Sequence, residues 1–277
     1  MMATIQSNFK MRFIFKAIMF CVVFTGLFVF FSFTRSFFPN SLERLAHGVI
    51  GAVAAFLTTC LFLKFDRKQF SDIGLVFQRN TMAKFLAGIA VGIAIMGVLA
   101  TGVLYLTNAR IEVNTGNNVL HFLLATLPLL PLAFMEELGF RAYPLQILKD
   151  KIGIRLAIII TSTLFALYHI ANGWTIASSF YGPAVWGLVF GLAAIYSKGI
   201  AMPTGIHYAA NLTTSAFGTG NSSVSIWTVK HSVTATPKGV DWTTVLPFFA
   251  LLAFAIICLE LYMRRKTTAN IVAYVKR

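Results

Sequence analysis

Residues 134–141 read Phe-Met-Glu-Glu-Leu-Gly-Phe-Arg and place two carboxylates and one guanidinium inside an apolar run that opens near Leu120. An ionised group at membrane depth costs roughly 2.5–3.5 kcal/mol even on the mildest insertion scale. Such groups persist where they face a polar cavity and have partners. The stretch therefore predicts a membrane protein whose functional centre contains Glu136, Glu137 and Arg141.

The composition of the chain favours the same class. Of its 277 residues, 57% are hydrophobic and 12% are charged, and the mean hydropathy is +0.77. Soluble domains carry about 25% charged residues. We expect an all-α polytopic transmembrane bundle, because apolar runs long enough to cross a bilayer recur along the chain. The expected spans are about eight, at 17–33, 45–63, 85–106, 120–148, 154–172, 183–197, 200–216 and 243–262.

The basic residues indicate how the chain lies in the membrane. The 23 Lys and Arg outnumber the 9 Asp and Glu, which gives a formal charge of +14. These basic residues sit in short loops beside the spans, which fits the positive-inside rule and contact with anionic membrane lipids. No basic-aromatic module stands outside the spans, so no nucleic-acid partner is expected. The basic segments alternate between successive spans, which predicts a multi-pass protein with both termini cytoplasmic, and we expect a bacterial inner membrane.

The cysteines and the N-terminus carry no separate function. Cys21, Cys60 and Cys258 lie singly inside apolar runs without a CxxC motif, so neither a disulfide framework nor a cysteine metal site is predicted. The apolar run 17–33 is longer than the core of a signal peptide, and no cleavage-site pattern follows it. We interpret this run as a retained transmembrane helix.

Five ionisable residues lie deep within the expected spans: Glu136, Glu137, Arg141, His169 and His207. At about 1.5 Å per residue, Glu136, His169 and His207 lie roughly 18, 21 and 13 Å from the inner ends of their spans. These depths overlap, which is compatible with one site between spans four, five and seven. Glu137 and Arg141 are four residues apart on one helix face and can pair, whereas Glu136 points about 100° away.

Three motifs carry a resemblance to a known family. Glu136-Glu137-x-x-x-Arg141, Phe165-x-x-x-His169 and His207-x-x-x-Asn211 occur in the order and spacing of the CPBP family, the CAAX-prenyl endopeptidase and bacteriocin-processing (Abi) membrane proteins. Ala142 departs from the pattern, since many members have Gly there. The resemblance implies a catalytic helix core at 119–216, preceded by transmembrane helices and an interfacial connector at 1–118. An outer polar loop, a last transmembrane helix and a basic tail follow at 217–277.

The resemblance implies an intramembrane endopeptidase that acts on a membrane-associated protein or peptide. A desolvated carboxylate can serve as a general base, so Glu136 is expected to activate water with help from His169. His207 and Asn211 are expected to stabilise the oxyanion. Glu137, Arg141 and Phe165 are expected to support the site.

Several alternatives stay open from the sequence. A zinc site of Glu136, His169 and His207 competes with the mechanism that needs no cofactor, although Asn211 suits an oxyanion hole better than a metal. A non-catalytic scaffold or regulator, or a bacteriocin-immunity protein of the same fold, is the alternative function. A transporter or proton relay would spread its titratable groups across the membrane, whereas the deep titratable groups of this chain cluster on spans four, five and seven. The sequence leaves the substrate, its prenylation and the oligomeric state open.

Overall fold

The computed structural model describes residues 2–107, 109–218, 224–230 and 242–275. Of the outer loop and tail expected within 217–277, residues 219–223, 231–241 and 276–277 lie outside the described residues. The described chain folds into helices and one pair of short strands. The α-helices are α1 (Met2–Ser32), α2 (Glu43–Asp66), α3 (Thr81–Thr107), α4 (Val119–Thr126), α5 (Leu129–Glu137), α6 (Tyr143–Ile152), α7 (Ile154–Ala171), α8 (Ile176–Ser179), α9 (Val185–Ser197), α10 (Ala201–Ala216) and α11 (Trp242–Val275). Shorter elements are the 3-10 turns η1 (Phe33–Phe37), η2 (Asn40–Leu42) and η3 (Phe70–Ile73), the π-helical turns η4 (Leu138–Ala142) and η5 (Phe180–Ala184), and the strands β1 (Arg110–Val113) and β2 (Trp227–Lys230).

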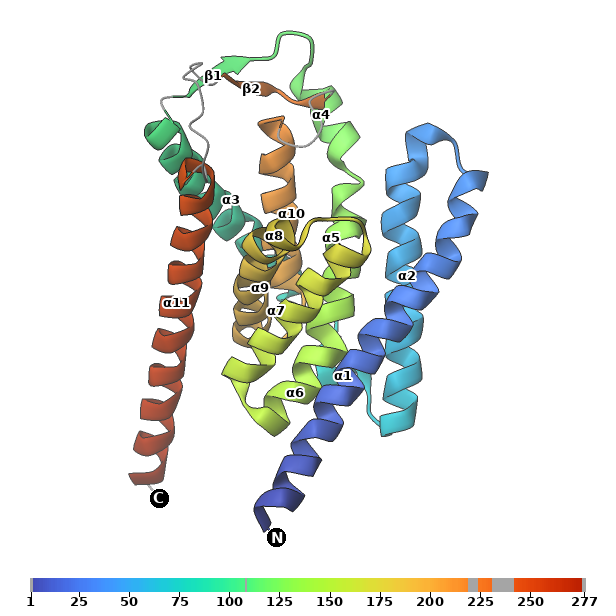
Figure 1. Ribbon diagram of the computed structural model, residues 1–277, viewed down its shortest axis with the longest axis vertical. Coiled ribbons are helices and arrows are strands. Elements are labelled where there is room, and N and C mark those ends of the chain that lie inside the picture. The colour runs from blue at the N-terminus through green and yellow to red at the C-terminus, as the bar shows by residue number, and fades with distance from the viewer. Residues whose placement is uncertain (1, 108, 219–223, 231–241, 276–277) are drawn as a thin grey trace.

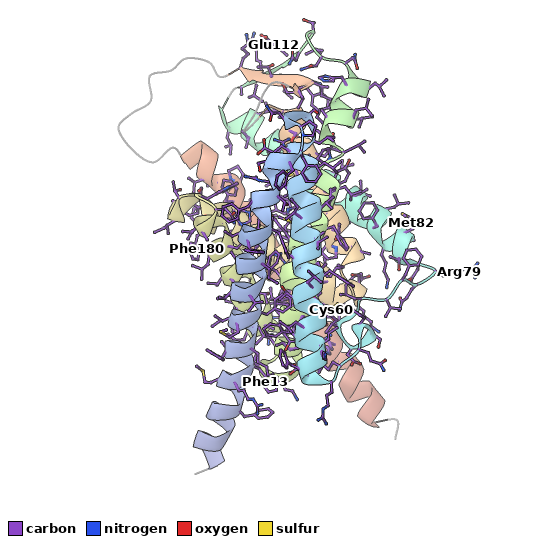
Figure 2. The ribbon with its side chains drawn as sticks, turned by 90° about the vertical axis from the view of Figure 1, so that its right-hand side faces the viewer. Phe13, Cys60, Arg79, Met82, Glu112 and Phe180 are labelled. Carbon is purple, nitrogen blue, oxygen red and sulfur yellow. The ribbon has the colours of Figure 1, made fainter. Side chains whose placement is uncertain are left out.

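The helices form one bundle with two different ends. The hairpin of α1 and α2 lies on one flank and α11 on the other, with α5, α7, α9 and α10 between them (Figure 1). The strands cover one end, and the start of α1 and the end of α11 lie at the opposite end (Figure 1). Glu112 on β1 and Phe13 on α1 mark these two ends in Figure 2.

The helical membrane class predicted from the sequence is confirmed. Among the residues that the structure describes, seven segments are long and apolar enough to cross a membrane: Phe9–Phe37, Asn40–Asp66, Thr81–Leu106, Val119–Ile152, Ile154–Ala171, Ile176–Ser197 and Val245–Lys266. The remaining expected span, 200–216, corresponds to the shorter helix α10, which has 16 residues. The presence of eight spans therefore stays a prediction.

The expected fourth span is not one continuous helix. Pro128 precedes α5 and separates it from α4, and the π-helical turn η4 separates α5 from α6. Pro144 lies in the first turn of α6. Proline is tolerated there because the first turn of a helix needs no N–H donor.

The two polar loops expected on one side of the membrane join in a small sheet. β1 and β2 pair antiparallel, with Ile111 opposite Val229. The Lys230 ammonium lies 3.3 Å from Glu112, and the Asn114 amide donates to the Ser225 carbonyl oxygen at 2.9 Å. Both strands alternate polar and apolar residues, but each has 4 residues, the shortest run for which alternation indicates a strand.

The glycines of α3 bring its backbone into contact with α10. A Cβ atom on Gly88 would lie 2.2 Å from the Met202 carbonyl oxygen, and one on Gly205 would lie 2.2 Å from the Phe85 carbonyl oxygen. Gly88 and Gly92 form a Gly-x-x-x-Gly pattern, which is typical of closely packed membrane helices. Because α10 carries His207, the crossing with α3 fixes the depth and rotation of that residue.

At the end of the bundle opposite the sheet, ion pairs join the outer helices to the core. Arg155 on α7 donates two hydrogen bonds to Glu260 on α11, at 2.6 and 2.7 Å. Glu260 lies four residues before Arg264 on its own helix, but it accepts its hydrogen bonds from the neighbouring helix α7. Asp66 on α2 pairs with Lys16 on α1 and accepts a hydrogen bond from the Tyr143 hydroxyl at 2.7 Å.

Candidate active site

The two glutamates end α5 inside the bundle. The side chains of Glu137 and Arg141 are fully buried, and Glu136 is 7% exposed. One oxygen of Glu137 lies 3.4 Å from the Arg141 guanidinium. The π-helical turn η4 begins directly after Glu137 and contains Arg141, and such turns occur frequently at functional sites. Glu137 and Arg141, whose spacing allows them to pair, form a buried ion pair.

His207 lies between the two carboxylates. Its Nδ1 is 2.8 Å from Oε1 of Glu137, and its Nε2 is 3.5 Å from Oε2 of Glu136. An ionised carboxylate can only accept, so Nδ1 carries the proton that it donates to Glu137. Glu137 thus orients His207 as well as pairing with Arg141, which leaves Nε2 turned towards Glu136.

Aromatic rings surround the Arg141 guanidinium. Its central carbon lies 4.3 Å from the ring centre of Phe165 and 5.3 Å from that of Phe190. None of its nitrogens has a hydrogen-bond partner among the described residues. The negative faces of these rings and the Glu137 carboxylate offset part of the cost of burying this charge.

His169 is linked to the cluster through Phe165. Nδ1 of His169 donates to the Phe165 carbonyl oxygen at 2.9 Å, and the two rings meet edge-on at 4.6 Å between centres. The same Phe165 ring lies 6.1 Å from the His207 ring. The Phe165 ring therefore lies near both histidine rings.

The structure brings some predicted site residues together more closely than others. Glu136, Glu137, Arg141, Phe165 and His207 form one continuous contact network. Within the described part of the chain, no hydrogen bond or ion pair joins His169 or Asn211 to the glutamates. Asn211 lies on α10 one turn after His207, partly exposed, as the four-residue spacing predicts.

Helix α9 contributes a site residue, Phe190, that was not predicted from the sequence. The Phe190 ring stacks on the imidazole of His207 at 4.5 Å between centres and 15° between planes. A Cβ atom on Gly187 would lie 3.0 Å from Cα of Ser162, so the glycine lets α9 approach α7 closely enough for this stack. The Gly187-x-x-x-Gly191 pattern that frames Phe190 was the available signal.

The proposed zinc ligands do not fit a metal in this arrangement. No three His, Cys, Asp or Glu side chains of residues 2–107, 109–218, 224–230 and 242–275 are placed to hold a metal ion together. Glu136 and His207 approach each other, but His169 is not placed to complete a group of three ligands with them.

A comparison with known families finds one similarity in the part of the chain that holds this cluster. Residues 117–213 match the family of type II CAAX prenyl endopeptidases described as Rce1-like. The match identifies an Rce1-like domain in this part of the chain. The Rce1-like domain begins just before α4 and ends within α10, so it includes every predicted site residue and also Phe190. A comparison with curated proteins finds no match.

The Rce1-like domain accounts for the central helices and not for those around them. Helices α1, α2, α3 and α11 lie outside the matched residues. α3 nevertheless holds α10 in place through Gly88 and Gly205. With its apolar segments and its membrane-protease family, the chain is a multi-pass membrane protein.

Proposed function

We propose that the chain is an intramembrane endopeptidase that hydrolyses a peptide bond in a membrane-associated protein or peptide. The observation that carries the proposal is the buried arrangement Glu136–His207–Glu137 inside an Rce1-like domain. A structural role would be served by the pair of Glu137 and Arg141 alone. The second carboxylate, turned towards the free nitrogen of the histidine, adds a proton acceptor that packing does not require.

In this proposal Glu136 is the general base. Its carboxylate takes a proton from a water molecule, and the oxygen of that water adds to the carbonyl carbon of the scissile bond. The proton then passes to the leaving amine as the C–N bond breaks. His169 assists by orienting the water through Nε2, because its Nδ1 is occupied by the Phe165 carbonyl oxygen.

His207 and Asn211 would stabilise the oxyanion. This role needs a proton on Nε2 of His207 in addition to the one that Nδ1 donates to Glu137. Two flanking carboxylates suit the resulting imidazolium, since they balance its charge in a medium of low dielectric constant. A donor aimed at an oxyanion typically contributes about 2.7–4 kcal/mol to transition-state stabilisation.

The test compares the same substitution, glutamate to glutamine, at two positions. Glu136→Gln removes the base while keeping size and hydrogen-bonding capacity, and Glu112→Gln makes the same change on exposed β1. We expect terminal-peptide mapping to find the same cleavage products in membranes that contain the parent chain and in membranes that contain Glu112→Gln. These products should be missing from membranes that contain Glu136→Gln. Thermal unfolding in detergent should show that all three proteins are folded. Identical peptide termini from folded Glu136→Gln and the parent chain would overturn the proposal.

A further inference from the structure

A cavity away from the candidate active site lies between α3, α9, α10 and α11. Its volume is about 650 Å³. None of Glu136, His169 and His207 lines it. Its wall is almost entirely apolar and is typified by Val91, Leu192, Met202 and Phe254. Ligand-binding pockets have volumes of this order, about 300–1,000 Å³.

Two cations close one end of this apolar space. Arg265 and Lys266 of α11 belong to its lining, and both side chains are exposed. Neither forms a salt bridge with another residue that the structure describes. The nearby carboxylate of Glu260 does not neutralise them, because it is bound by Arg155 and faces Arg264.

Further basic residues surround this cationic end. Lys266 interacts electrostatically with Lys149 of α6, and Lys149 also interacts with Lys68 and Lys198. The acidic group that faces Lys149 is Asp150. The local field is therefore strongly positive at the end of the bundle where α11 leaves the apolar region.

We propose that this cavity binds one anionic phospholipid. An acyl chain would occupy the apolar space between α3 and α11, and the phosphate would lie against Arg265 and Lys266. Basic pockets between transmembrane helices at a membrane surface have the chemistry that anionic lipid headgroups require. A second cavity, of about 730 Å³, also contains lysines, but its Lys84 is hydrogen-bonded to Gln78.

The site is connected to the helix that carries His207. Met202 and Ile206 of α10 line the cavity, and Ile206 directly precedes His207 in the chain. A bound acyl chain would therefore pack against the face of α10 next to the candidate active site. The binding of lipid does not depend on the proposed catalysis, and its test is independent of any proteolytic activity.

The test is native mass spectrometry of the purified full chain in detergent, after delipidation and incubation with equal amounts of phosphatidylglycerol and phosphatidylcholine. We expect one phosphatidylglycerol to be retained in preference to phosphatidylcholine, and soluble glycerol phosphate not to be retained. Arg265→Gln/Lys266→Gln should weaken phosphatidylglycerol retention by tenfold or more, since each surface cation contributes roughly a factor of five.

Two further variants separate this site from general lipid binding. Arg12→Gln/Lys64→Gln removes one Arg and one Lys from exposed positions outside the cavity and should leave retention unchanged. Cys258→Trp fills the cavity without a change in charge and should lower retention. Equal retention of both lipids by the parent chain, or an equal loss in the two charge variants, would overturn the proposal. Unchanged retention in folded Arg265→Gln/Lys266→Gln would overturn it as well.

Discussion

At the scale of single residues, Glu137 links the groups of the cluster. One of its oxygens is 2.8 Å from Nδ1 of His207 and 3.4 Å from the Arg141 guanidinium. Its other oxygen has no hydrogen-bond partner among the described residues. A carboxylate so placed fixes the tautomer of the histidine, while the arginine compensates its charge.

Loss of the Arg141 charge should destabilise the protein. Arg141→Met leaves Glu137 buried without its cationic partner, which typically costs about 3–5 kcal/mol. We expect this loss in the free energy of unfolding, measured by denaturant titration in mild detergent. The double variant Glu137→Gln/Arg141→Met should recover a large part of it.

Arg155→Met is the matched control, because it breaks the exposed pair with Glu260 and should have a much smaller effect. A loss for Arg141→Met no larger than that of Arg155→Met would show that the buried pair does not hold the cluster together.

Chelation should leave the proposed activity intact. Among the described residues, Glu136, His169 and His207 do not converge on one metal position. We expect cleavage by the purified protein to continue in a zinc chelator, and elemental analysis to find less than one zinc per chain. Activity that is lost in chelator and restored by zinc would contradict this expectation.

At the scale of elements, close helix crossings place the site. Gly88 and Gly205 allow the backbones of α3 and α10 to touch, and Gly187 brings α9 and its Phe190 against α7. The π-helical turn η4 then rotates α6 relative to α5 after Glu137. The glycine contacts are possible because glycine has no side chain to keep the helices apart. Small residues at helix contacts are typical of helix packing in membranes.

Alanine substitutions can test the crossing of α3 and α10. The Cβ of Gly88→Ala would lie 2.2 Å from a backbone oxygen, so the helices must separate. We expect a loss of about 1–3 kcal/mol in stability, as for other overpacked positions, together with reduced cleavage because His207 moves with α10. Gly97→Ala, on the same helix with nothing within 4 Å of the added atom, should change neither. Equal effects of the two substitutions would argue against close packing at Gly88.

At the scale of the whole molecule, polar and basic segments separate to opposite ends. The paired strands with Glu112 cover one end, whereas Phe13, the start of α1 and the end of α11 lie at the other (Figures 1 and 2). The positive-inside rule predicts that the second end lies in the cytoplasm.

Cysteine labelling can test this orientation. Single substitutions Glu112→Cys, Arg12→Cys and Arg264→Cys place exposed thiols at the two ends. A membrane-impermeant maleimide added to intact cells should label Glu112→Cys and leave the other two unlabelled until the membrane is opened. The parent chain gives the background from its three native cysteines within the spans. Different labelling of Arg12→Cys and Arg264→Cys would contradict an even number of crossings.

Much of the architecture was predictable from local patterns. Long apolar runs identified the helical membrane class, because a bilayer demands about 20 apolar residues per helix whatever the neighbouring helices do. The motif spacings placed Glu137 near Arg141 and His169 near Phe165, because residues four apart on a helix are neighbours. The break between α5 and α6 was not predicted. It is a π-helical turn inside an apolar run, and no specific proline or glycine pattern marks such a turn.

Sequence alone established which residues are too costly to lie in an apolar span without a purpose: Glu136, Glu137, Arg141, His169 and His207. Their mutual contacts depended on the tertiary structure. The stack of Phe190 on His207, the partner of Glu260 and the pairing of β1 with β2 all join segments that are distant in the chain. Helix periodicity determines the face on which a side chain lies, whereas the packing of one helix on another determines which side chain it meets.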